Sequence, residues 1–338
     1  MRRGKWWGGV IALCCLTMLS HEKAEAVIGI PDEAPAATLV VPLLEAGISS
    51  SHNTLVVANN ICNAKIIVHW EVWDVEGANV DLFGNAEIAN YAAWVSDFVT
   101  ILRLASQAQK TQLTDGSFYH GFLTIDVVTN TTNALPTEES YPFSAKNCLK
   151  GLIYYVRLPE GAADGIPAVH IEGGVSGVNT NARGFYQSRD DREKIDNHAR
   201  HYAELTTRGL PVADDDAFLD FIISRVYLSP TLNGASRIII WAWGPPAWGA
   251  QGPGDGGRGP FTATHRGENG QIAARSSLNL PRVVNIINVS GTANGEVWIE
   301  NLPEHFNVYA FSFNTASLVA GNAALTWEVM FPSTIIAE

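Results

Sequence analysis

From residue 38 onward the hydrophobic positions form short runs, most with the two-residue period of a β-strand, separated by turn-forming residues. In the run KIIVHWEVW, Val68 and Trp70 fall on one face of a strand and His69 and Glu71 on the other. Strands at this spacing, without helices between them, are typical of antiparallel sandwiches. In the first half the pattern predicts strands over Thr38–Glu45, Leu55–Asn60, Lys65–Asp74, Asn79–Phe83, Phe118–Thr129 and Leu152–Leu158.

Two segments of the first half have a more specific interpretation. The β-rich runs between Leu55 and Trp73 flank the short turn-prone sequence ICNA, which predicts a β-hairpin with Cys62 at its tip. The segment from Tyr91 to Leu104 is apolar enough to be packed, and it fits a strand as well as a short helix.

The second half contains two segments with helical periodicity. Ser188–Leu205 places apolar residues at helical spacing behind a capping pair, and Asp216–Arg225 repeats them every three or four residues. They predict a helical insertion at about residues 186–228, followed by a mobile glycine- and proline-rich loop at 244–260. Strands are expected again over Arg237–Trp243, Phe261–His265, Arg282–Val289, Gly295–Leu302, Asn307–Phe313 and Leu325–Phe331.

These elements predict a mainly β fold, an antiparallel β-sandwich that is either one extended or two adjoining sandwiches, with a short α-helical insertion. The expected organisation is an N-terminal β portion over residues 27–160 and a second β portion over residues 161–338. A chain of this length suffices for one large or two ordinary domains.

The first 26 residues have the pattern of a cleaved secretory signal peptide. Basic residues precede an apolar run from Trp6 to Leu19, and Ala24 and Ala26 fit the small-x-small cleavage pattern. The apolar run is shorter than the roughly 20 residues that span a bilayer, so a retained anchor is the weaker interpretation. The expected location is therefore periplasmic or secreted, with no membrane insertion after cleavage.

The charge balance of the chain excludes one class of partner. Its formal net charge is −12, and removal of the four basic and two acidic side chains of residues 1–26 makes this −14. Such a chain repels nucleic acid and anionic lipid, so neither is expected as a partner.

After cleavage two cysteines remain, Cys62 and Cys148. In an oxidising compartment a disulfide between them is favoured, and the alternative is a pair of separate thiols.

Several stretches carry the overall pattern of a known group. The opening PDEAPAATLVVPLLE, the TLVVANN and KIIVHWEVWDVEG runs, the strand GFLTIDVV and the late strand RIIIWAW resemble a group of exported bacterial proteins predicted to be β-sandwiches. The resemblance implies a sandwich and an exported location. The group has no established activity or catalytic residues, so it implies neither for this chain.

Motifs for cofactors and metals have simpler explanations. The run from Gly252 to Gly257 matches GxGxxG, but it continues into a proline and a strand instead of a helix, so no cofactor is expected. His198 and His201 are three residues apart on the expected helix and are weak metal candidates. Asp214 and Asp216 are equally weak, because acidic residues at a helix start are favoured by its dipole.

Tryptophans are the best candidates for a binding surface. Trp241 and Trp243 share one face of a strand, and Trp248 lies in the adjoining loop. Burial of the first two in the core is the favoured interpretation for that pair, and Trp248 is the best single candidate for a contact residue. We expect a non-catalytic structural, adhesive or ligand-binding protein whose partner is a glycan or a cell-surface protein. The rival is a secreted hydrolase acting on polysaccharide, which would need two carboxylates in a cleft.

Overall fold

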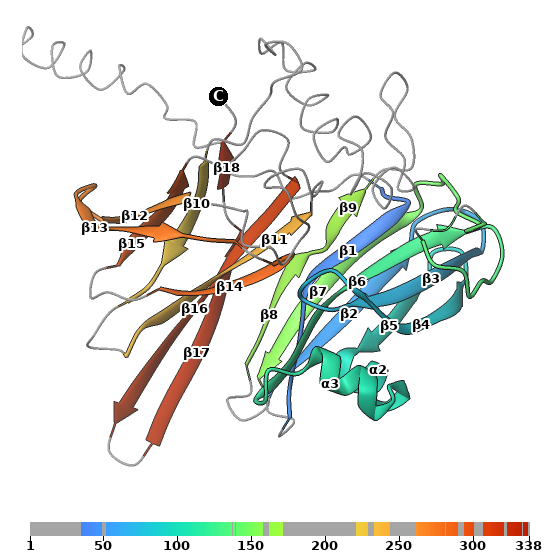
Figure 1. Cartoon of the computed structure of the whole chain (residues 1–338), viewed down its shortest axis with the longest axis horizontal. Coiled ribbons are helices and arrows are strands. Elements are labelled where there is room, and N and C mark those ends of the chain that lie inside the picture. Colours follow the sequence, from blue (N-terminus) through green and yellow to red (C-terminus); the bar gives the residue numbers. More distant parts are fainter. Residues whose placement is uncertain are drawn as a thin grey trace, which may run out of the picture.

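The computed structural model of the chain describes residues 35–48, 52–136, 138, 140–157, 162–171, 221–228, 233–243, 261–280, 282–289, 294–300, 307–320, 323–332 and 334–336. The protein is mainly β and is built from antiparallel sheets, as the alternating pattern predicts. The sheets form an N-terminal and a C-terminal portion that lie side by side (Figure 1).

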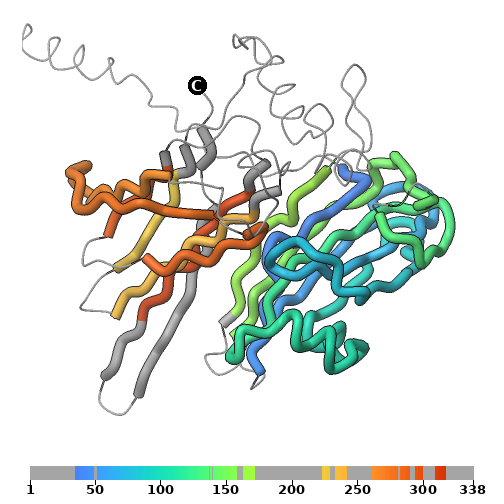
Figure 2. The backbone as a smooth tube through the Cα atoms, in the orientation of Figure 1, coloured from blue at the N-terminus to red at the C-terminus, as the bar shows by residue number. Residues whose placement is uncertain are grey.

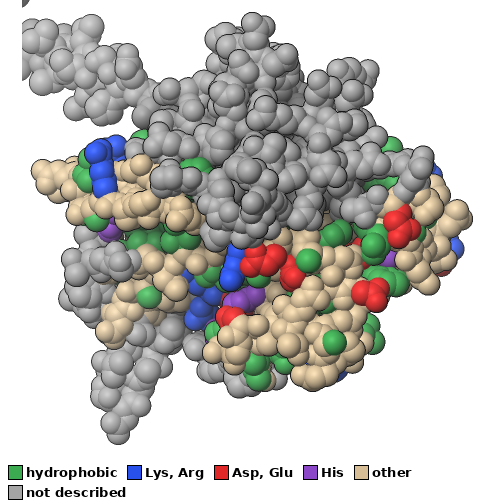
Figure 3. Space-filling view, in the orientation of Figure 1, with side chains coloured by type: hydrophobic (Ala, Val, Ile, Leu, Met, Phe, Trp, Pro, Cys, Tyr) green, Lys and Arg blue, Asp and Glu red, His purple; other side chains and the backbone are tan. Residues whose placement is uncertain are grey.

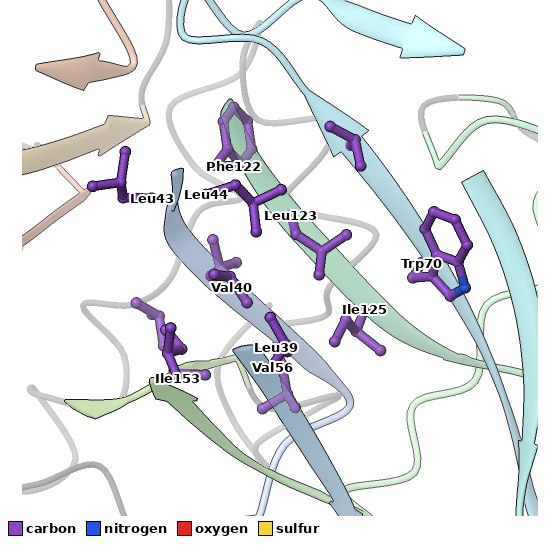
Figure 4. Close-up of a cluster of buried hydrophobic side chains, with 14 of the residues drawn as sticks. Leu39, Val40, Leu43, Leu44, Val56, Trp70, Phe122, Leu123, Ile125 and Ile153 are labelled. Carbon is purple, nitrogen blue, oxygen red and sulfur yellow. The ribbon is translucent and has the colours of Figure 1, made fainter. Parts of the chain in front are cut away.

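Two sheets make the N-terminal portion. Sheet I has the order β4-β3-β6-β1-β9 and comprises β1 (Thr38–Gly47), β3 (Ile66–Trp73), β4 (Asn79–Ile88), β6 (Phe118–Val128) and β9 (Val169–Ile171). Sheet II has the order β5-β2-β7-β8 and comprises β2 (His52–Asn60), β5 (Ala93–Asp97), β7 (Leu149–Arg157) and β8 (Ala162–Pro167). Their facing side chains form one buried cluster, in which Leu39 and Ile125 of sheet I approach Val56 and Ile153 of sheet II (Figure 4).

The expected hairpin at Leu55–Trp73 is wrong, although both of its strands exist. The strand β2 pairs with β5 and β7, whereas β3 pairs with β4 and β6, so the turn between them crosses from one sheet to the other. The amide of Asn60 holds this crossover, because it donates to the carbonyl oxygens of Ala64 (2.7 Å) and Ala89 (3.0 Å). Both strands are apolar on one face, and the crossover lets those faces bury each other across the sandwich.

The ambiguous segment from Tyr91 to Leu104 contains both a strand and a helix. β5 leads directly into α2 (Phe98–Leu104), where the side chain of Asp97 caps the helix by accepting from Thr100 N at 2.9 Å. A second short helix, α3 (Gln107–Leu113), begins with a capping box between Ser106 and Gln109. Together these helices connect sheet II to sheet I.

Two further sheets make the C-terminal portion. Sheet III has the order β14-β11-β16-β17 and comprises β11 (Ala235–Trp243), β14 (Val284–Val289), β16 (Asn307–Ala320) and β17 (Ala323–Pro332). Sheet IV has the order β13-β12-β15-β10-β18 and comprises β10 (Phe221–Val226), β12 (Phe261–Gly267), β13 (Ile272–Leu278), β15 (Gly295–Glu300) and β18 (Thr334–Ile336).

Sheet III is the middle layer of the molecule. On β11, Ile238 and Ile240 pack in a cluster with sheet IV, whereas Ile239 and Trp241 belong to the large core of the N-terminal portion. Burial on both faces explains why this strand reads as the uninterrupted apolar run IIIWAW instead of an alternating one. The two portions therefore share one hydrophobic core.

The strands β8 and β9 lie beyond residue 160 but belong to the N-terminal sheets, and Figure 2 shows them beside the other strands of that portion. Among the described residues, the C-terminal sheets begin at Phe221.

The helix expected over Asp216–Arg225 is wrong for its described part. Phe221–Val226 is the strand β10, which pairs with β15 on one side and β18 on the other. Its β-branched residues suit a strand, and pairing on both edges overrides a weak local periodicity. The rest of the expected insertion, the signal peptide and the loop at 244–260 lie outside the described residues.

The structure confirms the favoured cysteine pairing: Cys62 and Cys148 form a disulfide with a Cα–Cα distance of 5.2 Å. None of the helices that the structure describes is long and apolar enough to cross a membrane.

Candidate functional site

Trp241 is not a contact residue. Its side chain is fully buried, and its ring lies edge-on to Phe122 of β6 with ring centroids 6.0 Å apart. This tryptophan packs sheet III onto sheet I, so the favoured core interpretation is confirmed and the alternative, a ligand contact at Trp241, is wrong. The side chain of Trp243 and the whole of Trp248 lie outside the described residues, as do His198, His201, Asp214 and Asp216.

Charged side chains gather where the two portions meet (Figure 3). Arg237 of β11 donates two hydrogen bonds to the carboxylate of Glu45 on β1, at 2.5 Å from Nη1 to Oε2 and 2.8 Å from Nη2 to Oε1. The Arg237 guanidinium also lies 4.2 Å above the ring centre of Phe313 on β16. This bidentate pair ties the first strand of one portion to the central layer of the other.

A histidine and a second carboxylate extend this pair toward solvent. His120 Nε2 lies 3.2 Å from Glu45 Oε2, and His120 Nδ1 lies 3.4 Å from Asp115 Oδ2. Burial alone would raise the pKa of Glu45, but the charge of Arg237 and the hydrogen bonds from Arg237 and His120 hold that pKa well below its ordinary value. Glu45 is therefore a fixed anion, which suits a structural contact and not a proton-transfer group.

A second polar group crosses the outer face of sheet I, the face turned away from sheet II. Strand register places Asn85, His69, Asp126 and Thr38 in one row over four neighbouring strands. His69 Nδ1 lies 3.3 Å from Asn85 Oδ1, and Asp126 accepts hydrogen bonds from the hydroxyls of Thr38 and of Tyr141, the latter at 2.8 Å. These side-chain contacts join β4 to β3 and β6 to β1.

His69 and Glu71 differ from what the alternating pattern suggests. They occupy the polar face of β3 as expected, but they are 1% and 0% exposed instead of facing solvent. Glu71 accepts a hydrogen bond from the Asn79 amide, and His69 Nε2 lies 3.8 Å from Glu71 Oε2. Among the described residues, no group of three histidine, cysteine or carboxylate side chains is arranged to hold a metal ion.

The outer face of sheet IV carries an aromatic residue that the sequence reasoning missed. Trp298 of β15 is half-buried, its Nε1 donates to Glu296 Oε2 at 3.2 Å, and the guanidinium of Arg266 lies 4.6 Å from its ring centre. Arg225 of the neighbouring strand contacts Glu296 with Nε 3.5 Å from Oε1. The signal was present in the run GEVWIE, where alternation sets Trp298 on the polar face of its strand.

An open depression of about 360 Å³ lies at β12 and β13 and is lined by Phe261, Thr262, Arg275, Ser276 and Ser277. Register places Arg275, Thr264 and Trp298 in one row across β13, β12 and β15. We call Trp298, Arg225, Arg266, Arg275 and Glu296 the Trp298 face. The described residues that line the depression are aromatic, hydroxyl-bearing and basic.

No family model and no curated protein matches this chain.

Proposed function

We propose that the chain is an exported, non-catalytic binding protein that contacts an acidic glycan through the Trp298 face. Export is supported by the pattern of the first 26 residues and by the Cys62–Cys148 disulfide, a bond that persists in oxidising compartments.

The observation that carries the proposal is a half-buried tryptophan with the Arg266 guanidinium over its ring, and with Arg275 in the same strand row at the rim of an open depression, in a chain whose net charge is −12. An indole ring stacks on the apolar face of a sugar, and guanidinium groups bind carboxylate or sulfate groups with paired hydrogen bonds. Glu296 forms an ion pair with Arg225 and accepts a hydrogen bond from the indole nitrogen of Trp298. Arg275, at the rim of the depression, is therefore the main anion-binding group.

The rest of the described charge clusters support a scaffold role. Glu45 is held by Arg237, and Asp126 is held by Thr38 and Tyr141, so these buried carboxylates join strands to one another. A face carried on sheets with a shared core has its backbone fixed before binding, so it loses less conformational entropy than a flexible segment would.

The test is a calorimetric titration of the purified protein with a polyuronate and with neutral dextran. We expect the polyuronate alone to bind, and Trp298→Ala and Arg275→Ala each to weaken binding by about tenfold or more. Lys65→Ala is the matched control, because Lys65 is an exposed cation immediately before β3, in the other portion, and its ion pair among the described residues is with Glu87. A parent protein that does not bind the polyuronate, or variants that bind as the parent does, would overturn the proposal.

A further inference from the structure

The outer face of sheet II, turned away from sheet I, carries a continuous apolar row. Register places Val95, Val57, Leu152 and Pro167 side by side across the four strands β5, β2, β7 and β8. The side chains of Val95 and Leu152 are 56% and 40% exposed. Valine and leucine side chains left in water on a regular sheet forgo the free energy that burial would supply, roughly 25 cal/mol for each Å² of apolar surface.

Exposed apolar residues concentrate on this sheet. Among the described residues, the exposed large hydrophobic side chains are Ile48, Ile61, Tyr91, Val95, Leu104, Leu152 and Ile272, and four of these seven lie on sheet II or at one end of it. Ile61 follows β2 and Tyr91 precedes β5, and the hydrogen bond from Asn60 N to Ala92 O (2.8 Å) holds these two chain segments together. An apolar patch of this kind on a sheet face marks an interaction surface.

The adjoining row adds to the patch. Leu55 and Tyr154 are neighbours across β2 and β7, and the Tyr154 ring lies close against Gly165 of β8. A Cβ at Gly165 would stand 2.8 Å from that ring, so the glycine leaves room for the tyrosine beside β8. Leu55 and Tyr154 thus extend the apolar row by a second row on the same face.

Two charges of opposite sign flank the row. Val57 of β2 pairs with Val95 of β5 and with Leu152 of β7. Asp97 lies on β5 beside Leu55, and Lys150 lies on β7 beside Asn59, so the two charges stand on opposite sides of Val57 along one diagonal of the sheet. Among the described contacts Lys150 makes no ion pair, and its side chain is half-buried at the margin of the patch. In a face-to-face dimer, a two-fold axis that lies in the interface plane above Val57, perpendicular to this diagonal, brings the Lys150 of each copy against the Asp97 of the other.

From this self-complementarity we propose that the outer face of sheet II is an isologous interface that binds a second copy of the chain. Val57, Val95 and Leu152 form the apolar centre of the interface, and two Lys150–Asp97 pairs form its rim. This proposal does not depend on the Trp298 face, which lies on sheet IV in the other portion.

The experiment is sedimentation equilibrium of the purified protein, with light-scattering mass as a second readout. We expect the mass of a dimer for the parent protein and of a monomer for Leu152→Lys and Val57→Lys, with far-ultraviolet circular dichroism unchanged. Lys150→Glu sets like charges against each other without touching the core, and it should raise the dimer dissociation constant by about tenfold or more. Ile272→Lys, at an exposed apolar position on sheet IV, is the matched control and should remain dimeric.

A monomeric parent protein would overturn the proposal, and so would folded Leu152→Lys and Lys150→Glu variants that dimerise as tightly as the parent. Flotation of the parent with phosphatidylcholine vesicles, lost in Leu152→Lys while the parent sediments as a monomer, would assign the face to a lipid surface and equally reject the dimer.

Discussion

At the scale of single residues, His170 of β9 makes stability depend on pH. Its Nε2 accepts a hydrogen bond from Gly151 N at 3.0 Å, which requires a neutral ring, and burial together with the charge of Lys150 lowers its pKa to about 4. Between pH 6.5 and 4 the unfolded chain binds a proton that the native ring does not, so stability falls as pH falls through this window.

We therefore expect the parent protein to lose about 2 kcal/mol of unfolding free energy through this residue between pH 7 and pH 5. His170→Gln retains an acceptor for Gly151 N and removes the titration, so its urea-unfolding curves should shift less over the same interval. The pH 5 limit keeps Glu45 outside the test, because a carboxylate with a lowered pKa loses its contribution only as pH falls below its ordinary value of 4.5. Equal pH dependence in both proteins would contradict the assignment.

The alternating pattern identified polar and apolar faces correctly at this scale, but it could not tell what covers a face. His69 and Glu71 lie on the polar side of β3 and are nevertheless buried, and Trp241 is buried by a strand more than 100 residues earlier in the chain, where Phe122 lies. Burial depends on contacts between segments that are distant in the sequence, and the local alternation of hydrophobic and polar residues carries no information about them.

At the scale of elements, the hydrophobic pattern predicts where strands begin and end better than it predicts which strands pair. Most strands of the first half lie within a few residues of their expected bounds, because each carries its own period and turn residues. Pairing is different: β2 and β3 are consecutive yet lie in separate sheets, and β10 became a strand only through β15 and β18, which follow it at a distance. The cysteine count was informative because it reports a long-range contact directly.

The Cys62–Cys148 bond belongs to this scale, because it ties the end of β2 to the start of β7, where Ile61 N also donates to Cys148 O at 2.9 Å. The sequence separation is 86 residues, and closing a loop of that length is worth about 4 to 5 kcal/mol in the chain-entropy model. We expect Cys62→Ala/Cys148→Ala to lower the urea midpoint and to keep the β2–β7 pairing. Adding a reductant should lower the urea midpoint of the parent protein and leave that of the double variant unchanged. A reduced parent protein as stable as the oxidised one would contradict the prediction.

At the scale of the whole molecule, the shared core determines how the two portions unfold. Phe311 and Phe313 of sheet III pack around Tyr155 of β7, whose hydroxyl donates to Leu43 O at 2.8 Å, and Arg282 pairs with Glu76 at 2.8 Å on the other side of the junction. Because neither portion buries these side chains alone, we expect calorimetry to show one cooperative transition for both.

The Glu45–Arg237 pair tests this coupling. Arg237→Met leaves Glu45 buried beside His120 without its bidentate partner, which should cost about 3 to 5 kcal/mol and lower the temperature of the single transition. Glu45→Gln/Arg237→Met removes the stranded charge, so the double variant should be more stable than Arg237→Met alone. If the single variant unfolds in two transitions, the portions are joined mainly by this pair and not by the apolar core. If instead the double variant is less stable than Arg237→Met, the cost does not come from an uncompensated carboxylate, and the structural role given to Glu45 is wrong.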